Sequence, residues 1–176
     1  MLVFVSCDST KTAFKQCIKQ VCDESKGEYE YHHIPDEVAP PNEQDRLQRM
    51  LDLIRISDVI FMDVTPTRVL VNGVEQHVTN SGVLIEYGAL VSYPPYREKL
   101  RVFCEDSVSR SLLHPYFLMT VHRFSTKNLV DEADPQSLRS QVKKMIEHYK
   151  KGLPELARKR GEEIEALKRI TGLGKD

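Results

Sequence analysis

The chain has 176 residues, and its 25 Lys and Arg stand against 26 Asp and Glu, which gives a formal net charge of −1. A chain of this length can bury a core large enough to fold as one domain without disulfides or a structural metal. A balanced charge offers no basic surplus for nucleic acids or anionic membranes, so we expect neither as a partner and expect a small molecule instead.

The cysteines argue for a reducing compartment and against a metal site. Cys7, Cys17, Cys22 and Cys104 are scattered, with no Cys-x-x-Cys pair and no histidine clusters at zinc spacing. The first residues lack a basic segment and a cleavage site, and no later run has the length of a membrane span. We therefore expect a cytoplasmic protein that holds no metal and no cofactor and does not bind a membrane.

The first third of the chain alternates strand and helix patterns. Residues 2–7 are a continuous run of β-formers, followed by turn and capping residues and by a helical pattern that closes at Lys26-Gly27. A short strand is expected at 29–34, and the prolines between 35 and 41 predict an irregular loop. Helical spacing resumes at Glu43 and leads into an apolar strand at 59–64, whose consecutive apolar residues indicate burial on both faces.

The alternation continues to residue 124. Asn72-Gly73 between two β-prone arms predicts a hairpin over 69–78, which either decorates the surface or closes over a pocket. A helix over 80–91, a strand over 100–104, a helical piece over 107–113 and a strand over 120–124 follow. Such an order predicts a parallel sheet of about five strands with helices on both faces, and ligands bind at the carboxyl ends of such strands.

The C-terminal part is predicted to be helical over 135–149 and 154–170, so we expect an α/β domain over 1–150 and a charged helix over 151–176. The apolar stripe on this last helix is narrow. Such a stripe is more often a docking or self-association contact than a nucleic-acid arm, because the acidic residues of the segment offset its Lys and Arg.

Glu86 is the residue most out of keeping with its neighbours. It is the one carboxylate in an apolar segment with glycines, residues 80–90. Burial disfavours a charged carboxylate unless donors or cations compensate, so a position of this kind usually serves binding or chemistry. The alternative is a partly exposed helix residue whose neighbours face inward.

The segment that runs from Asn80 to Gly88 resembles the Asp-x-Gly-Thr-x-x-Glu-x-Gly signature of the nucleoside 2-deoxyribosyltransferase family, with Glu86 at the place of the signature glutamate. Residues 56–63 are similar to the Ser-Asp and hydrophobic strand of that family, and the strand ends at Asp63, where the family carries another acid. The resemblance covers about three quarters of the chain.

The resemblance implies a flavodoxin-like α/β fold with a C-terminal helical extension, and an enzyme that acts on the N-glycosidic bond of a nucleoside, nucleotide or related ribosyl compound. Glu86 would be the nucleophile, and a position near a helix start would keep it ionised. Asp63 would protonate the leaving base. Asn80 and Gly82 would contact the sugar, and Ser6 and Asp8 would line the base or phosphate pocket.

Two departures from the signature bear on the reaction. Asn80 stands in place of the family's aspartate and Val83 in place of its threonine, so transfer, hydrolysis and binding without turnover all stay open. The segment is also similar, less closely, to TIR and TIR-like domains, whose enzymatic members cleave NAD, and a signalling module that binds nucleotides without turnover is the alternative from another class.

Two side chains near the expected site have competing interpretations. Asp63 is either an acid in the reaction or a cap of the turn after its strand. Cys7, beside Asp8, is more often a buried structural thiol than a nucleophile when no histidine partner is in view.

Overall fold

The computed structural model describes residues 1–8, 10–33, 43–108 and 121–171. The predicted proline-rich loop and residues 109–113 of the predicted helical piece lie outside these ranges. Among the described helices, none is both long enough and apolar enough to cross a membrane.

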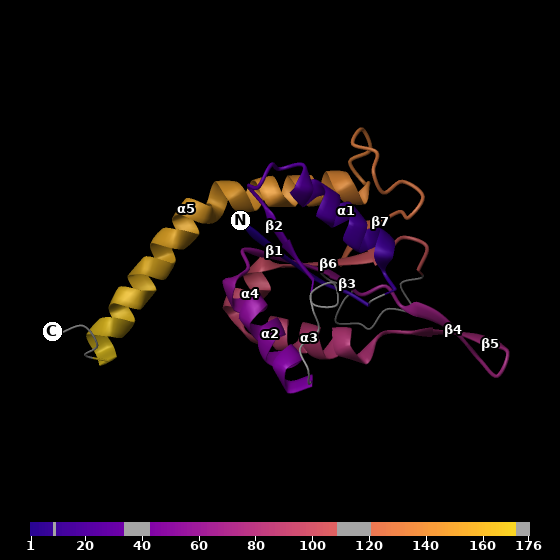
Figure 1. Ribbon diagram of the computed structural model, residues 1–176, viewed down its shortest axis with the longest axis horizontal. Coiled ribbons are helices and arrows are strands. Elements are labelled where there is room, and N and C mark those ends of the chain that lie inside the picture. Colours follow the sequence, from indigo (N-terminus) through magenta and orange to yellow (C-terminus); the bar gives the residue numbers. More distant parts are fainter. Residues whose placement is uncertain (9, 34–42, 109–120, 172–176) are drawn as a thin grey trace. The chain divides into compact units, whose positions relative to one another are not determined.

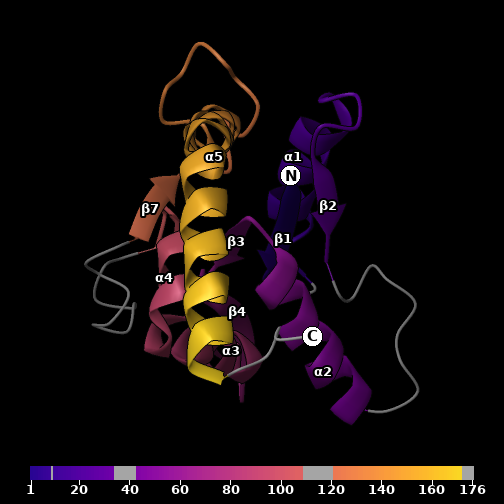
Figure 2. The same ribbon diagram turned by 90° about the vertical axis from the view of Figure 1, so that its left-hand side faces the viewer.

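A five-stranded parallel sheet forms the centre of the fold, as the alternating sequence pattern predicted. Its strands stand in the order β2-β1-β3-β6-β7, and every neighbouring pair is parallel. In Figure 2, β7, β3, β1 and β2 follow one another across the view. The strand bounds are β1 Leu2–Ser6, β2 Glu30–His32, β3 Val59–Asp63, β6 Leu100–Glu105 and β7 Val121–Phe124.

Helices cover both faces of this sheet, and Figure 1 shows α1 on the side opposite α2 and α3. The bounds are α1 Thr12–Asp23, α2 Glu43–Ile56, α3 Ser81–Ser92 and α4 Pro94–Lys99. The flavodoxin-like α/β class expected from the sequence is confirmed. The short α4 was not predicted, because Pro94-Pro95 resembles a loop, although proline is well tolerated in the first turn of a helix.

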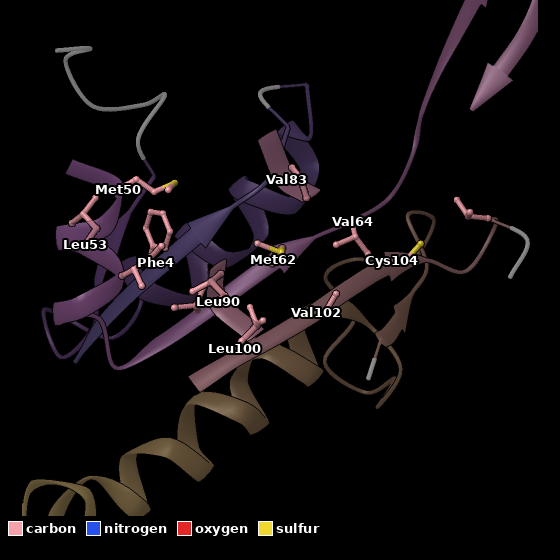
Figure 3. Packing of buried hydrophobic residues seen from close by; sticks show 13 residues of the cluster. Phe4, Met50, Leu53, Met62, Val64, Val83, Leu90, Leu100, Val102 and Cys104 are labelled. Atoms are coloured by element: carbon pink, nitrogen blue, oxygen red, sulfur yellow. The ribbon is translucent and has the colours of Figure 1, made fainter. Parts of the chain in front are cut away.

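The two faces of the sheet carry separate apolar layers. On one face, Phe4 and Met62 pack with residues of α2 and α3 such as Leu53 and Leu90 (Figure 3). On the other face, the ring of Phe14 from α1 lies 5.7 Å from the ring of Phe103. Alternation of side chains along each strand therefore decides which helix a residue meets.

The predicted hairpin is present as β4 Thr67–Val71 and β5 Val74–Val78, and Figure 1 shows it extending away from the sheet. Asn72 and Gly73 both adopt positive φ, 52° and 78°, which is the turn geometry that matches the twist of two paired strands. Leu70 and Val74 are 77% and 61% exposed, so the hairpin presents apolar side chains to its surroundings.

The last helix, α5, runs without interruption over Leu138–Thr171. The two helices expected on either side of residues 150–153 are thus one, with Pro154 inside it. Pro154 is exposed, so the carbonyl that loses its helical donor can bond to water. The chain divides into two compact units, Met1–Lys143 and Lys144–Asp176, whose boundary falls within α5 and seven residues before the sequence-based boundary at 150/151.

Candidate functional site

The candidate site begins with a contact between Ser6 and Glu86. Ser6 ends β1, is 3% exposed, and lies on the face of the sheet that carries Phe4 and meets α3. Its hydroxyl donates a hydrogen bond to Oε2 of Glu86. The contact joins residues 80 positions apart in the chain and lies at the carboxyl edge of the sheet, where ligands of this fold class bind.

Glu86 faces inward from α3. Val83 and Leu90, at helical spacing on either side of it, are buried, whereas Ile85 is 69% exposed. Glu86 itself is partly exposed, as the alternative interpretation expected, but its carboxyl is turned toward Ser6. Burial raises the pKa of the Glu86 carboxyl, and the hydrogen bond from Ser6 acts in the opposite direction.

The donor that acts on Glu86 differs from the one expected. Glu86 is the sixth residue of α3, beyond the first turn, where backbone N–H groups already donate within the helix. The influence of a helix terminus falls off within that first turn. The hydroxyl of Ser6, on a neighbouring strand, supplies the hydrogen bond instead.

Asn80 caps α3 and also ties the helix to the loop after β1. Its Oδ1 accepts a hydrogen bond of 2.8 Å from the backbone N–H of Gly82, and its Nδ2 donates one of 2.7 Å to Oδ2 of Asp8. A Cβ at position 82 would lie 3.0 Å from the capping oxygen, so glycine leaves room for the cap. Gly88, by contrast, borders open space, and no close approach in the described residues requires glycine there.

Asp8 carries a stable negative charge next to this cap. The backbone N–H of Thr10 donates to its Oδ1 at 2.9 Å, and this bond, followed by the one from Asn80, lowers the pKa of the Asp8 carboxyl. A carboxylate at position 80 would face Asp8 at hydrogen-bonding distance and repel it. Asn80, which differs from the aspartate of the signature described above, can therefore donate a hydrogen bond to Asp8 on the facing loop.

Asp63 is placed away from this group of residues. Ser6 is level with Met62 in the β1–β3 pair, so the next residue, Asp63, lies on the opposite face of the sheet. It is 2% exposed, and its Oδ1 accepts hydrogen bonds from the backbone N–H of Thr65, at 2.8 Å, and from the Thr65 hydroxyl. These contacts correspond to the turn cap that the sequence left open as an alternative.

Burial makes the carboxyl of Asp63 a weaker acid than an exposed aspartate. It raises the pKa of this carboxyl to about 6, and the two hydrogen bonds from Thr65 only partly oppose that effect. Its Oδ2 has no hydrogen-bond partner among the described residues. No contact joins this carboxyl to Glu86 in the described part of the chain.

The structure thus brings together Ser6 with Glu86, and Asp8 with Asn80 and Gly82. It adds one contact that sequence reasoning missed: Sγ of Cys7 lies 3.8 Å from Nε2 of His33. Cys7 and His33 lie at the ends of two strands expected from the sequence, but the sequence alone does not show that these strands, β1 and β2, are neighbours.

Within the described ranges, no group of three or more His, Cys, Asp or Glu side chains is arranged to hold a metal ion. Comparison of the chain with protein-family models, with curated proteins and with solved structures gave no match.

Proposed function

We propose that this protein cleaves the N-glycosidic bond of a nucleoside, nucleotide or related ribosyl compound, with Glu86 as the nucleophile. The observation that carries the proposal is the contact between the Ser6 hydroxyl and an inward-facing Glu86 at the ligand-binding edge of a parallel sheet. A partly desolvated carboxylate held by one hydroxyl is suited to attack an electron-poor carbon.

The reaction would proceed in two steps. In the first, Oε1 of Glu86 attacks the anomeric carbon while Ser6 holds Oε2; a C–O bond forms, and the C–N bond breaks with its electron pair going to the base. In the second, the oxygen of water attacks the anomeric carbon, the C–O bond to Glu86 breaks with its electron pair and restores the carboxylate, and the proton of the water passes to solvent. An acceptor base in place of water would make the same enzyme a transferase.

Asp8 supports the proposal as a second carboxylate at the same edge. Its pKa is lowered, so it is ionised at neutral pH and can accept a hydrogen bond from a sugar hydroxyl or stabilise the developing positive charge. Asn80, held by Asp8 and by Gly82, would position the start of α3 and retain an amide hydrogen for the sugar.

The leaving base requires a proton. Asp63, with a pKa raised to about 6, has the acidity of a general acid but lies on the other face of the sheet from Ser6. Its contacts with Thr65 favour the structural role, so we propose that water protonates the base.

One observation favours the alternative, a module that binds a nucleotide without turnover. The raised pKa of Glu86 increases the fraction of neutral carboxyl, which is a hydrogen-bond donor and a poor nucleophile. Calorimetric binding of a nucleotide or NAD without release of the base would favour this alternative over the enzyme.

The experiment that tests the enzyme is the substitution Glu86→Gln, with Glu98→Gln on the exposed surface of α4 as the matched control. Base release is measured over a panel of nucleosides, nucleotides and NAD. We expect a loss of about a thousandfold or more for Glu86→Gln, because the nucleophile is removed, and no change for the control. Equal rates for Glu86→Gln and the unsubstituted protein would refute the proposal.

We extend the proposal to self-association through the outer side of α3. Leu84 and Ile85 are 37% and 69% exposed, and Glu86 is the one charged residue of this helix. The exposed Gly88 and Ala89 allow close approach, so an equally apolar second copy fits this side better than a charged partner does.

A further inference from the structure

Cys7 and His33 meet at the same sheet edge as the candidate site, but on the other side of the sheet. Each follows directly after its strand, Cys7 after β1 and His33 after β2, and these strands pair in parallel. Because side chains alternate along a strand, Cys7 points away from the side on which Ser6 contacts Glu86. The pair is therefore a separate group of reactive side chains.

The geometry of the pair suits proton transfer. Sγ of Cys7 lies 3.8 Å from Nε2 of His33, a separation at which a thiol can donate to an imidazole nitrogen. Cys7 is partly exposed, whereas His33 is only 2% exposed, so Cys7 is the more accessible member of the pair. A thiol next to a histidine is the arrangement that produces nucleophilic thiolate in proteins.

The other three cysteines have the opposite environment. Cys17, Cys22 and Cys104 are buried, and burial raises the pKa of their thiols to about 11, 12 and 11. They would stay protonated and shielded at neutral pH. They serve as internal references in the same molecule.

We propose that Cys7 and His33 form a thiol–imidazole pair that makes Cys7 a site of covalent modification by small electrophiles with an activated carbon. In this step the thiol proton passes to Nε2 of His33, the sulfur forms a bond to the electrophilic carbon, and the bond from that carbon to its leaving group breaks with its electron pair. The inference is independent of the proposed glycosidic reaction, since neither Glu86 nor Ser6 takes part.

Charges near the pair oppose as well as favour a thiolate. Asp8 follows Cys7 directly, and Asp63 is level with Cys7 when the β1–β3 register is continued by one residue. The Lys11 cation acts on both of these carboxylates. His33 is the group whose ring nitrogen lies 3.8 Å from the sulfur, so its removal tests the pair directly.

The test is the rate at which iodoacetamide alkylates each cysteine, followed by mass spectrometry of peptides at pH 6 and pH 7. Wild type is compared with His33→Gln and with an unstructured peptide that contains a single cysteine. We expect Cys7 in the wild type to react at least about threefold faster than the peptide at pH 6, and His33→Gln to lose that advantage, because a larger thiolate fraction outweighs its lower intrinsic nucleophilicity. Cys17, Cys22 and Cys104 should react far more slowly.

Two results would overturn the inference: a Cys7 rate no higher than that of the peptide, or equal Cys7 rates in wild type and a folded His33→Gln. Since His33 is buried, circular dichroism establishes whether the variant folds. If it does not, the comparison of wild-type Cys7 with the peptide decides the question alone.

Discussion

At the scale of single residues, one hydroxyl group opposes the effect of burial on the ionisation of Glu86. Two opposing influences act on this carboxyl, burial and the hydrogen bond from Ser6, and burial is the larger. A nucleophile must be ionised, so Ser6 would serve the reaction even though it touches no reacting atom. The sequence predicted that Ser6 and Glu86 belong to one site, but it did not predict that the Ser6 hydroxyl, 80 residues away in the chain, is the donor to Glu86.

Replacement of Ser6 by alanine should therefore raise the pKa of Glu86 further. Base release would require a higher pH, and the acid limb of the rate profile would move to higher pH, with about a tenfold loss of rate on that limb. The measurement is kcat/KM as a function of pH. Ser92→Ala, which removes a hydroxyl bonded to the carbonyl of Gly88 in the same helix, is the control and should leave the limb in place. An unchanged limb in Ser6→Ala would contradict this role.

Asp63→Asn separates the two roles of Asp63 through stability. The pKa of Asp63 is raised to about 6 from its usual value of 3.8, so the native protein binds the proton more tightly than the unfolded chain does. The free energy of unfolding contributed by this carboxyl is fully present below about pH 4 and is lost as pH rises through about 6. The asparagine keeps an acceptor for Thr65 and has no such dependence.

Urea unfolding at pH 4.5 and pH 7 tests this account of Asp63. The stability of wild type relative to Asp63→Asn should be higher at pH 4.5 than at pH 7, while base release stays within about threefold if Asp63 only caps the turn. A difference that does not vary with pH would contradict the raised pKa, and a large loss of kcat would restore Asp63 as the acid.

At the scale of elements, a buried lysine closes α2. Lys99 ends α4 and is 5% exposed, and its Nζ donates to the carbonyls of Ile54 at 2.6 Å and Ser57 at 2.7 Å. These carbonyls lie at and just beyond the C-terminal end of α2, where a cation is favoured and where helical carbonyls lack partners. Helix α2 packs against the face of β1 that carries Ser6, so a cap that holds the end of α2 also stabilises the packing on this face.

Lys99→Met should destabilise the fold by about 2–4 kcal/mol, because it removes a charged donor from the buried carbonyls of Ile54 and Ser57. Lys19→Met is the matched control: Lys19 is exposed and pairs with Asp23 at 3.4 Å within one helix, so its loss should cost less than about 1 kcal/mol. Chemical denaturation measures both. Similar small losses for the two variants would show that Lys99 does not hold the end of α2.

Local signals account for how well the elements were predicted. Asn72-Gly73 is sufficient to predict the hairpin, because few other residues adopt positive φ at both turn positions. Consecutive apolar residues likewise predicted β3. Pro154 led to the incorrect prediction of a helix break, because the effect of a proline depends on whether the freed carbonyl is solvated. The buried position of Lys99 could not be predicted, because its partners are 42 to 45 residues away in the chain.

At the scale of the whole protein, the parallel sheet gathers the candidate residues at one edge. The alternating pattern was enough to predict this edge, and with it the proximity of Ser6, Asp8 and the start of α3. It was not enough to predict faces. Asp63 and Ser6 lie on opposite faces of the sheet because of the register between β1 and β3. Nothing in either strand alone sets that register.

Self-association belongs to this scale too. Ile85→Lys places a charge on the outer side of α3, where Ile85 is 69% exposed, and should convert an oligomer into monomers without unfolding the protein. Sedimentation velocity over a range of concentrations measures the change, and Val130→Lys, at another exposed apolar position, is the control. A wild type that stays monomeric at all concentrations would contradict this contact.

The central claim is that Glu86 forms a covalent bond to a sugar. The most direct measurement is the mass of the peptide over residues 81–92 after incubation with nucleosides that carry fluorine at C2′, which slows breakdown of a glycosyl ester because the transition state is oxocarbenium-like. The account predicts an added mass on Glu86 equal to the fluorinated sugar minus one water in the wild type, and none in Glu86→Gln. Two results would contradict it. One is release of the base from the unfluorinated nucleosides while the fluorinated ones leave no sugar on Glu86. The other is no release of the base from any nucleoside, nucleotide or NAD.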